Sequence, residues 1–215
     1  MWEANGAGAG KTTLAQICGA VVMGRAPAVR TLTANDEENS KHLAGIAKAA
    51  PPVSLFDNAK VGVEGGSLEA AITAHDRIAP RTLGTNDTPE LPWRTTIYVT
   101  ANDASYSPDT HQRFVHVSLL APTGPRTYRH ASPILHAIEH RPALLRASLT
   151  ILRAHVVADR PRASVGHERF VEWSRVVADA VAWSSGADPA RARPPESASR
   201  ETEAARADSA AAASP

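Results

Sequence analysis

Residues 6–13 read GAGAGKTT, and this run combines residue types that hold phosphate. Glycines let the backbone turn its N–H groups onto phosphate oxygens. Lys11 can reach the terminal phosphates of a nucleotide, and the Thr12 hydroxyl can ligate Mg²⁺. A helix expected to start at Thr12 adds the positive end of its dipole. The predicted ligands of ATP and Mg²⁺ in this loop are Gly6, Ala7, Gly8, Ala9, Gly10, Lys11, Thr12 and Thr13.

The loop departs from the full G-x-x-x-x-G-K-[ST] pattern at one place, because Asn5 replaces the first glycine. Asparagine tolerates left-handed backbone better than most residues, so the loop can be retained. The alternative is a Gly/Ala-rich start that contains GKT by chance. The helical pattern that follows at once favours the phosphate-binding interpretation.

A nucleotide site needs a second acid for Mg²⁺, and Asp57 follows the apolar run VSLF at residues 53–56. The alternative is an ordinary aspartate in a turn after a strand. The next residue is Asn58, where many related ATPases carry a glutamate that polarises water. That difference argues against fast hydrolysis.

Two further polar residues border predicted strands. Asn102 follows TIYVT and is a candidate to contact the γ-phosphate or orient the attacking water, although turn asparagines are common. Arg113 precedes FVHVSL and is a candidate arginine finger that reaches the nucleotide of a neighbouring subunit. A solvated arginine is the simpler interpretation of Arg113 considered alone.

The elements that position these residues alternate along the first part of the chain. Asn35 is the expected N-cap of a helix over residues 36–49, with Glu38 completing a capping box. Short strands alternating with helices predict an α/β fold with a mostly parallel sheet. Strands are expected at residues 28–33, 53–56, 96–100 and 114–119, helices at 12–23, 36–49 and 68–74, and an extended loop or hairpin at 76–94.

The second part of the chain has a different pattern. Leu145, Leu149, Leu152 and Val156 are spaced as one face of a helix, and residues 170–181 repeat that spacing. From Ala187 onward the composition predicts a disordered tail. The expected organisation is an ATPase core at residues 1–122, a helical region at 123–186 and the tail at 187–215.

Composition excludes several classes of protein. The formal net charge is +1, which gives no overall sign of a polyanion partner. Cys18 is the only cysteine, so there is no disulfide framework or thiolate cluster. His136 and His140 have helical spacing but no obvious third ligand, so metal binding there is not favoured. With no apolar run of membrane-spanning length and no signal peptide, we expect a cytoplasmic protein without a membrane partner.

The order of the phosphate loop, Asp57, Asn102 and Arg113 resembles that of the AAA+ ATPases of the superfamily-3 helicase type. The chain is most similar to the ATPase part of primase-helicase replication proteins from phages and mobile elements, over roughly residues 5–185. That resemblance implies a three-layer αβα fold, single-stranded or forked DNA as partner and a homo-oligomeric ring. It also implies that Asp57 is the Walker B acid, Asn102 sensor 1 and Arg113 the arginine finger. Arg77 and Arg81 lie where such helicases place a DNA-contacting hairpin.

The strand that should precede the phosphate loop is largely missing, because only MWEA stands before Asn5. Four residues make a poor strand, and Glu3 is unsuited to a buried one. In the AAA+ arrangement this strand lies mid-sheet beside the one that ends at Asn102. We therefore expect an N-terminally truncated chain, or one whose start is misassigned, with a primase-type domain upstream in relatives.

Three functions compete on this basis. The first is a DNA-dependent ATPase of the replicative helicase type. The second is a catalytically weak nucleotide-binding remnant or switch from a decayed prophage, favoured by Asn58 and the missing strand. The third is a small-molecule kinase, which is disfavoured because an arginine-rich lid is not evident.

Overall fold

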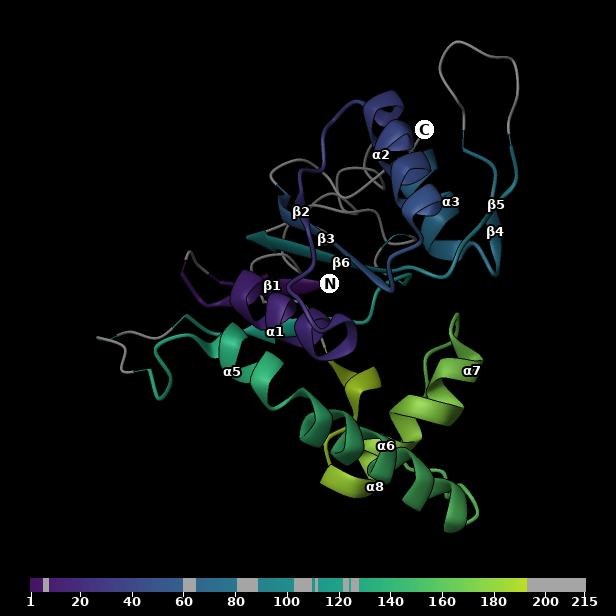
Figure 1. The fold of residues 1–215 in the computed structure, drawn as a ribbon. Helices are drawn as coiled ribbons and strands as arrows, with labels where there is room; N and C mark the ends of the chain where they lie inside the picture. Colours follow the sequence, from purple (N-terminus) through teal and green to yellow (C-terminus); the bar gives the residue numbers. More distant parts are fainter. Residues whose placement is uncertain are drawn as a thin grey trace, which may run out of the picture.

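Five parallel strands form the sheet at the centre of the protein (Figure 1). The structure is a computed structural model, and it describes residues 1–5, 8–59, 65–80, 89–102, 110, 112–121, 124 and 128–192. The strand order is β2-β3-β6-β1-β7, and every neighbouring pair is parallel. The α/β fold and the parallel sheet predicted from the alternation are thereby confirmed. The strands are β1 (Trp2–Ala4), β2 (Val29–Arg30), β3 (Val53–Ala59), β6 (Thr96–Asn102) and β7 (Val117–Leu119).

Helices cover both faces of this sheet, as expected for three αβα layers. Helix α1 (Lys11–Met23) buries Ala15 against Trp2 and Leu55 on one face. Helices α2 (Asp36–Ala49) and α3 (Gly66–Thr73) form the larger core cluster on the other face, where they meet Phe56 and Val99. Along β3 and β6, successive side chains point alternately to the core on the α1 face and to the core on the α2 and α3 face. This alternation is expected because neighbouring side chains of a strand lie on opposite faces of the sheet.

The expectation that the first strand is largely missing is wrong. β1 has three residues and is hydrogen-bonded on both sides, with Trp2 opposite Thr100 of β6 and Val117 of β7. Glu3 is 1% exposed, so it occupies a buried central strand after all. Its Oε2 lies 2.9 Å from Nδ1 of His116, which supplies the polar partner that a buried carboxyl needs. The pairing of β1 beside the strand that ends at Asn102 is the arrangement expected from sequence.

The predicted boundaries of α2 are confirmed. The Asn35 side chain accepts hydrogen bonds from the N–H groups of Glu37 and Glu38, so it is the N-cap. The predicted capping box is not formed, because the Glu38 carboxylate pairs with Lys41 one turn later. That ion pair is exposed and contributes little stability.

The irregular segment at residues 76–94 contains a short antiparallel hairpin, as predicted. Its strands are β4 (Arg77–Ile78) and β5 (Leu91–Pro92). Arg77 donates from Nε to Glu90 Oε2 at 3.1 Å and from Nη2 to the Glu90 carbonyl oxygen. Arg81 lies outside the described residues.

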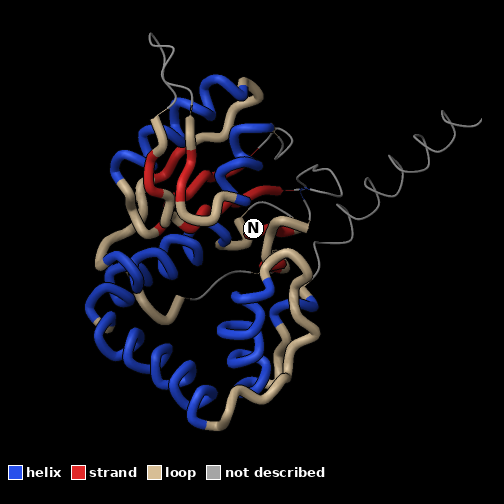
Figure 2. The backbone as a smooth tube through the Cα atoms, turned by 90° about the vertical axis from the view of Figure 1, so that its right-hand side faces the viewer, coloured by secondary structure: helices blue, strands red, loops and turns tan. Residues whose placement is uncertain are grey.

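The helical region lies beside α1, away from α2 and α3 (Figure 1). In Figure 2 its helices fill the lower part of the view, below the strands. Arg141 attaches this region to α1 by donating to the carbonyl oxygens of Val21 and Val22 at the C-terminal end of that helix. These donors satisfy carbonyls that a helix end leaves without intrahelical partners. The elements are α5 (Pro133–Glu139), α6 (Arg141–Val157), α7 (Val171–Trp173), a π-helical turn η1 (Ser174–Ala178) and α8 (Asp179–Ser185).

Two acids, the buried Asp179 and the half-buried Asp188, shape the loop between α6 and α7. Asp179 accepts from the N–H groups of Ala163 and Ser164, and Asp188 accepts from Ser164 Oγ and the N–H of Val165. Asp188 also caps a short 3₁₀ turn η2 (Pro189–Arg191), so the first residues of the predicted tail are ordered by contacts. Residues 193–215 of that tail lie outside the described residues. None of the helices in the described ranges combines the length and apolar character needed to cross a membrane.

Candidate functional site

The phosphate-loop residues lie at the carboxyl edge of the parallel sheet, between β1 and the first turn of α1. Gly8 and Gly10 have φ angles of 76° and 89°, in the left-handed region that favours glycine. Gly10 is the N-cap of α1. It has no side chain, so the N–H groups in the first turn of the helix donate no hydrogen bond to a capping side chain. Those N–H groups and the helix dipole suit an anionic ligand. Gly6 and Ala7 lie outside the described residues.

Asn5 does not use the left-handed backbone that made it acceptable in place of glycine. The described non-glycine residues with positive φ are Ala50, Asn58, Asp159 and Arg160, and Asn5 is not among them. Its side-chain oxygen instead accepts from the N–H of Ala121 at 2.9 Å. This bond ties the start of the loop to the segment after β7.

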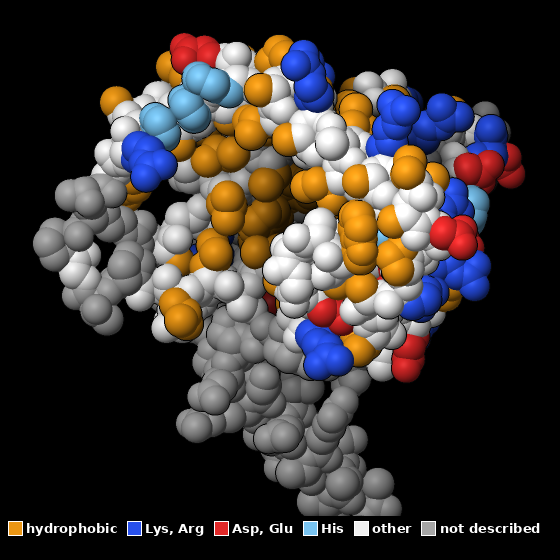
Figure 3. Space-filling view, turned by 90° about the horizontal axis from the view of Figure 1, so that it is seen from below, with side chains coloured by type: hydrophobic (Ala, Val, Ile, Leu, Met, Phe, Trp, Pro, Cys, Tyr) orange, Lys and Arg blue, Asp and Glu red, His pale blue; other side chains and the backbone are white. Residues whose placement is uncertain are grey.

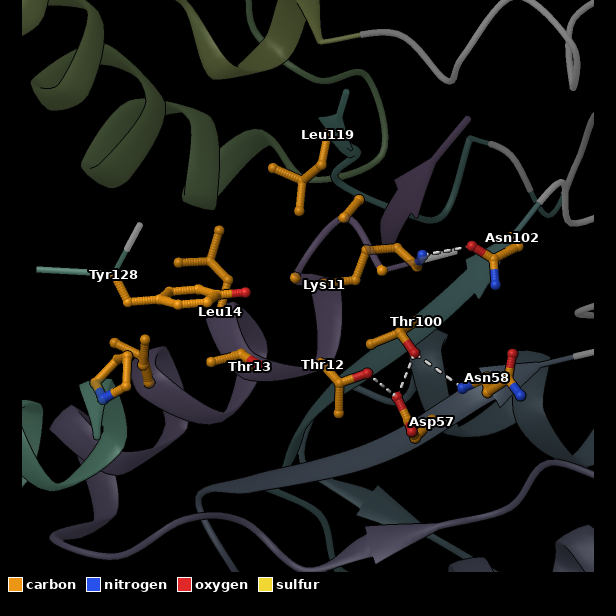
Figure 4. Close-up of a pocket in the computed structure, with 15 residues that line it drawn as sticks. Lys11, Thr12, Thr13, Leu14, Asp57, Asn58, Thr100, Asn102, Leu119 and Tyr128 are labelled. Atoms are coloured by element: carbon orange, nitrogen blue, oxygen red, sulfur yellow. Dashed lines mark hydrogen bonds between the residues drawn. The ribbon is translucent and has the colours of Figure 1, made fainter. Parts of the chain in front are cut away.

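Lys11 and Thr12 each contact one of the polar residues predicted from the strand ends (Figure 4). Lys11 is 7% exposed and donates from Nζ to Asn102 Oδ1 at 2.5 Å. Thr12 donates from Oγ1 to Asp57 Oδ1, also at 2.5 Å. Four candidate residues that are as far as 91 positions apart in the sequence therefore meet at one edge of the sheet.

The strand period explains why these side chains point the same way. Leu55 of β3 packs on the α1 face, so Asp57 two residues later shares that face. Tyr98 of β6 packs there too, so Thr100 and Asn102 follow on the same face. Asp57 is within β3 and Asn102 is the last residue of β6, whereas the sequence placed both just after their strands.

Thr100 is a member of this site that the sequence analysis missed. Its Oγ1 donates to Asp57 Oδ1 at 2.6 Å and accepts from the Asn58 N–H at 2.8 Å. Thr100 is 1% exposed and Asp57 is half-buried, so these bonds fix one oxygen of the Asp57 carboxylate from the buried side of the pocket. Its place two residues before Asn102, on the same strand face, is the signal that would have found it.

Asn58 interrupts the regular pairing between β3 and β6. Its φ is 53°, and the register between these strands shifts between Phe56 and Ala59. The bulge turns Asn58 toward the pocket, where its exposed amide lies beside Asp57 (Figure 4). An amide at this place can donate and accept hydrogen bonds but is not a base.

These residues line one pocket of about 700 Å³, a volume in the range of small-molecule sites. One end is polar and holds Lys11, Thr12, Asp57 and Asn102. The other end is apolar, and Tyr128 lies there beside Leu14 in Figure 4. The sequence analysis missed this apolar end, whose further members are Ile17, Leu119 and Pro133.

Of the arginines predicted from sequence, the two that the structure describes, Arg77 and Arg113, do not line this pocket. Arg113 is half-buried just before β7, and its N–H donates to the carbonyl oxygen of Thr110. Arg77 lies at the base of the hairpin, paired with Glu90. An arginine finger acts on a neighbouring subunit, and a hairpin contact acts on DNA, so both roles stay predictions.

Comparison of the chain with family models, with curated proteins and with solved structures gave no match in any of the three.

Proposed function

We propose that the chain binds ATP with Mg²⁺ in this pocket and is a DNA-dependent ATPase of the helicase type. The observation that carries the proposal is the meeting of Lys11, Thr12, Asp57 and Asn102 around the uncapped N-terminus of α1. A lysine and the N–H groups at the start of a helix suit phosphates, and a hydroxyl beside a carboxylate suits Mg²⁺. Each type of group that a Mg²⁺–triphosphate needs is present at one edge of the sheet.

The contacts among these residues are those of a site ready for its ligand. Lys11 Nζ rests on an amide oxygen, which a γ-phosphate oxygen can replace as the stronger, charge-assisted partner. Thr12 and Asp57 share a hydrogen bond that Mg²⁺ can replace by coordinating both oxygens. Asn102 is then placed to contact the γ-phosphate or the attacking water.

The apolar end of the pocket favours a nucleoside over a bare polyphosphate. The Tyr128 ring and the side chains of Leu14 and Pro133 offer the flat, apolar surface that a base requires.

Coupling to DNA and ring assembly are supported by the strand order and by the order of motifs. β6, which ends at Asn102, separates β1 from β3, which carries Asp57, and this is the arrangement expected from the AAA+ resemblance. In this proposal a neighbouring subunit's nucleotide is reached by Arg113, and Arg77 exchanges its exposed pairing with Glu90 for a DNA phosphate. Exposed ion pairs are weak enough for such an exchange.

Substitution of Lys11 tests nucleotide binding directly. Lys11→Ala removes a charged contact worth about 1.5–3 kcal/mol, so we expect the Kd for ATP to rise roughly 10- to 150-fold. The matched control is Lys48→Ala, which removes an exposed lysine from α2 and leaves the Kd unchanged. Titration of fluorescent ATP gives the Kd, and far-UV circular dichroism verifies folding. Equal affinity in the wild type and Lys11→Ala refutes the proposal.

A catalytically weak nucleotide-binding module is the second candidate, and Asn58 is the observation that favours it. Asn58 lies in the pocket where a base is needed to activate water. If Asn58 limits turnover, Asn58→Glu raises steady-state ATP hydrolysis without tightening ATP binding. Robust hydrolysis by the wild-type chain that increases with single-stranded DNA excludes this candidate and supports the first.

A further inference from the structure

A cluster of histidines lies on the surface of α5, outside the nucleotide pocket. Figure 3 shows histidine side chains gathered on this face of the molecule. His136, Glu139 and His140 each direct one ligand-type atom toward the others, and these three atoms lie within 4.8 Å of one another. The sequence analysis recognised the histidine pair and missed the carboxylate as the third ligand.

The geometry follows from helical spacing. His136 and Glu139 lie in the last turn of α5, and His140 is its C-cap, whose N–H still donates to the His136 carbonyl oxygen. Residues spaced i, i+3 and i+4 lie on the same side of a helical turn, which brings the three side chains together. The run HAIEH also has the H-x-x-E-H spacing in which two histidines bind zinc. Zn²⁺ bonds of about 2.0–2.1 Å place tetrahedral ligands roughly 3.3 Å apart, so modest rotation of these side chains completes the site.

One histidine is already oriented as a metal ligand. Nδ1 of His140 lies 2.9 Å from the carbonyl oxygen of His136. A carbonyl oxygen only accepts, so Nδ1 is the donor in this bond, and Nε2 is the nitrogen left to coordinate a metal. A backbone partner of this kind on the second ring nitrogen is typical of metal-ligating histidines.

A third histidine ring lies against the cluster. The ring of His130 stacks on that of His136, with the ring centroids 3.8 Å apart and the planes at 13°. This contact holds the His136 ring in place beside Glu139 and His140.

We propose that His136, Glu139 and His140 bind one divalent transition-metal ion, with Zn²⁺ as the natural occupant and water completing its coordination. Two imidazole nitrogens and one carboxylate oxygen form a ligand set suited to Zn²⁺ rather than Mg²⁺ or Ca²⁺. This site is independent of the proposed ATP binding.

The bound metal restrains the junction between α5 and α6. His140 is both the C-cap of α5 and the N-cap of α6. The next residue is Arg141, whose guanidinium holds the C-terminal end of α1. A metal held by His136 and His140 therefore stiffens the joint by which the helical region is attached to the sheet domain.

The first test measures metal binding by the full chain, prepared without a polyhistidine tag. Co²⁺ is the spectroscopic probe, because tetrahedral Co²⁺ with nitrogen and oxygen ligands absorbs visible light. We expect one Co²⁺ per chain, displaced by Zn²⁺ and not by Mg²⁺. His136→Ala and Glu139→Gln should weaken Zn²⁺ binding more than about tenfold, since losing even an outer-shell partner has that effect.

The matched control is His75→Ala, which removes an exposed histidine elsewhere and should leave the affinity unchanged. Zn²⁺ should also raise the melting temperature of the wild type and not that of His136→Ala, because a ligand of the folded state stabilises it. Lys11→Ala should still bind Zn²⁺, so failure of the ATP proposal is distinguishable from failure of this one. Stoichiometry and affinity that stay the same in His136→Ala and Glu139→Gln overturn the proposal.

Discussion

The buried pair of Glu3 and His116 should contribute strongly to the stability of the sheet by keeping β1 paired between β6 and β7. Glu3 lies at the centre of a three-residue strand, and its side chain is 1% exposed. The His116 side chain is 4% exposed, and the contact between them is 2.9 Å. Glu3→Ala removes this partner of a buried imidazole and leaves a cavity between β6 and β7.

The expected loss can be estimated from these values. Removing one partner of a buried hydrogen bond costs about 1–3 kcal/mol, and the cavity left by the side chain adds to this loss. That loss is a large fraction of the roughly 5–15 kcal/mol by which domains are stable. Glu3→Gln keeps the size and one acceptor oxygen, so we expect about 1 kcal/mol, the value of one ordinary hydrogen bond. Replacing both partners, as Glu3→Leu with His116→Phe, should be close to neutral because no buried polar group is left alone.

Urea denaturation followed by far-UV circular dichroism measures these differences at neutral pH. The control is Glu90→Ala, which breaks an exposed ion pair with Arg77 and should change the free energy of unfolding by less than about 1 kcal/mol. If Glu3→Ala changes stability no more than Glu90→Ala does, then Glu3 is not buried in a central strand, and the account of β1 given above is wrong.

Two further predictions concern the pocket and the helical region. Tyr128→Ala should weaken ATP binding by about 1–3 kcal/mol, the value of stacking one base, which is roughly a 5- to 150-fold rise in Kd. Competition titrations should show that binding of inorganic triphosphate is unchanged. Burial alone would raise the pKa of Asp179, but the N–H groups of Ala163 and Ser164 and the charge of Arg162 outweigh it and hold the pKa below its usual value. Its stabilising contribution is therefore present above the unfolded value of about 3.9 and lost as pH falls through the lower folded value. Acid titration followed by circular dichroism should show a smaller loss of stability over that range for Asp179→Asn than for the wild type.

Local patterns identified much of the α/β part of the fold. The boundaries of α2 were predictable because Asn35 caps it through its own neighbours and prolines follow its end. The strands β3 and β6 were predictable because their apolar runs are continuous. The bulge at Asn58 was not, since it depends on how two distant strands pair.

The residues of the candidate site also fall into two groups, those that a local pattern predicted and those that depend on contacts between distant elements. Lys11 and Thr12 were identified by local spacing, and Asp57 and Asn102 by their places at strand ends. Thr100 and Tyr128 were missed because a threonine within a strand and a tyrosine in a loop have no distinguishing local signal. Their roles depend on which side chains meet them from other elements.

The sequence by itself determined the glycine-rich turn and the helix after it, because glycine conformations and a helix start are local properties of one short segment. Only the tertiary structure decided that Trp2–Ala4 is a strand. A buried glutamate is unfavourable unless a partner is supplied, and that partner, His116, lies 113 residues away. The same holds for the pocket, where Lys11 meets Asn102 and Thr12 meets Asp57 only after the parallel sheet brings the carboxyl ends of its strands to one edge.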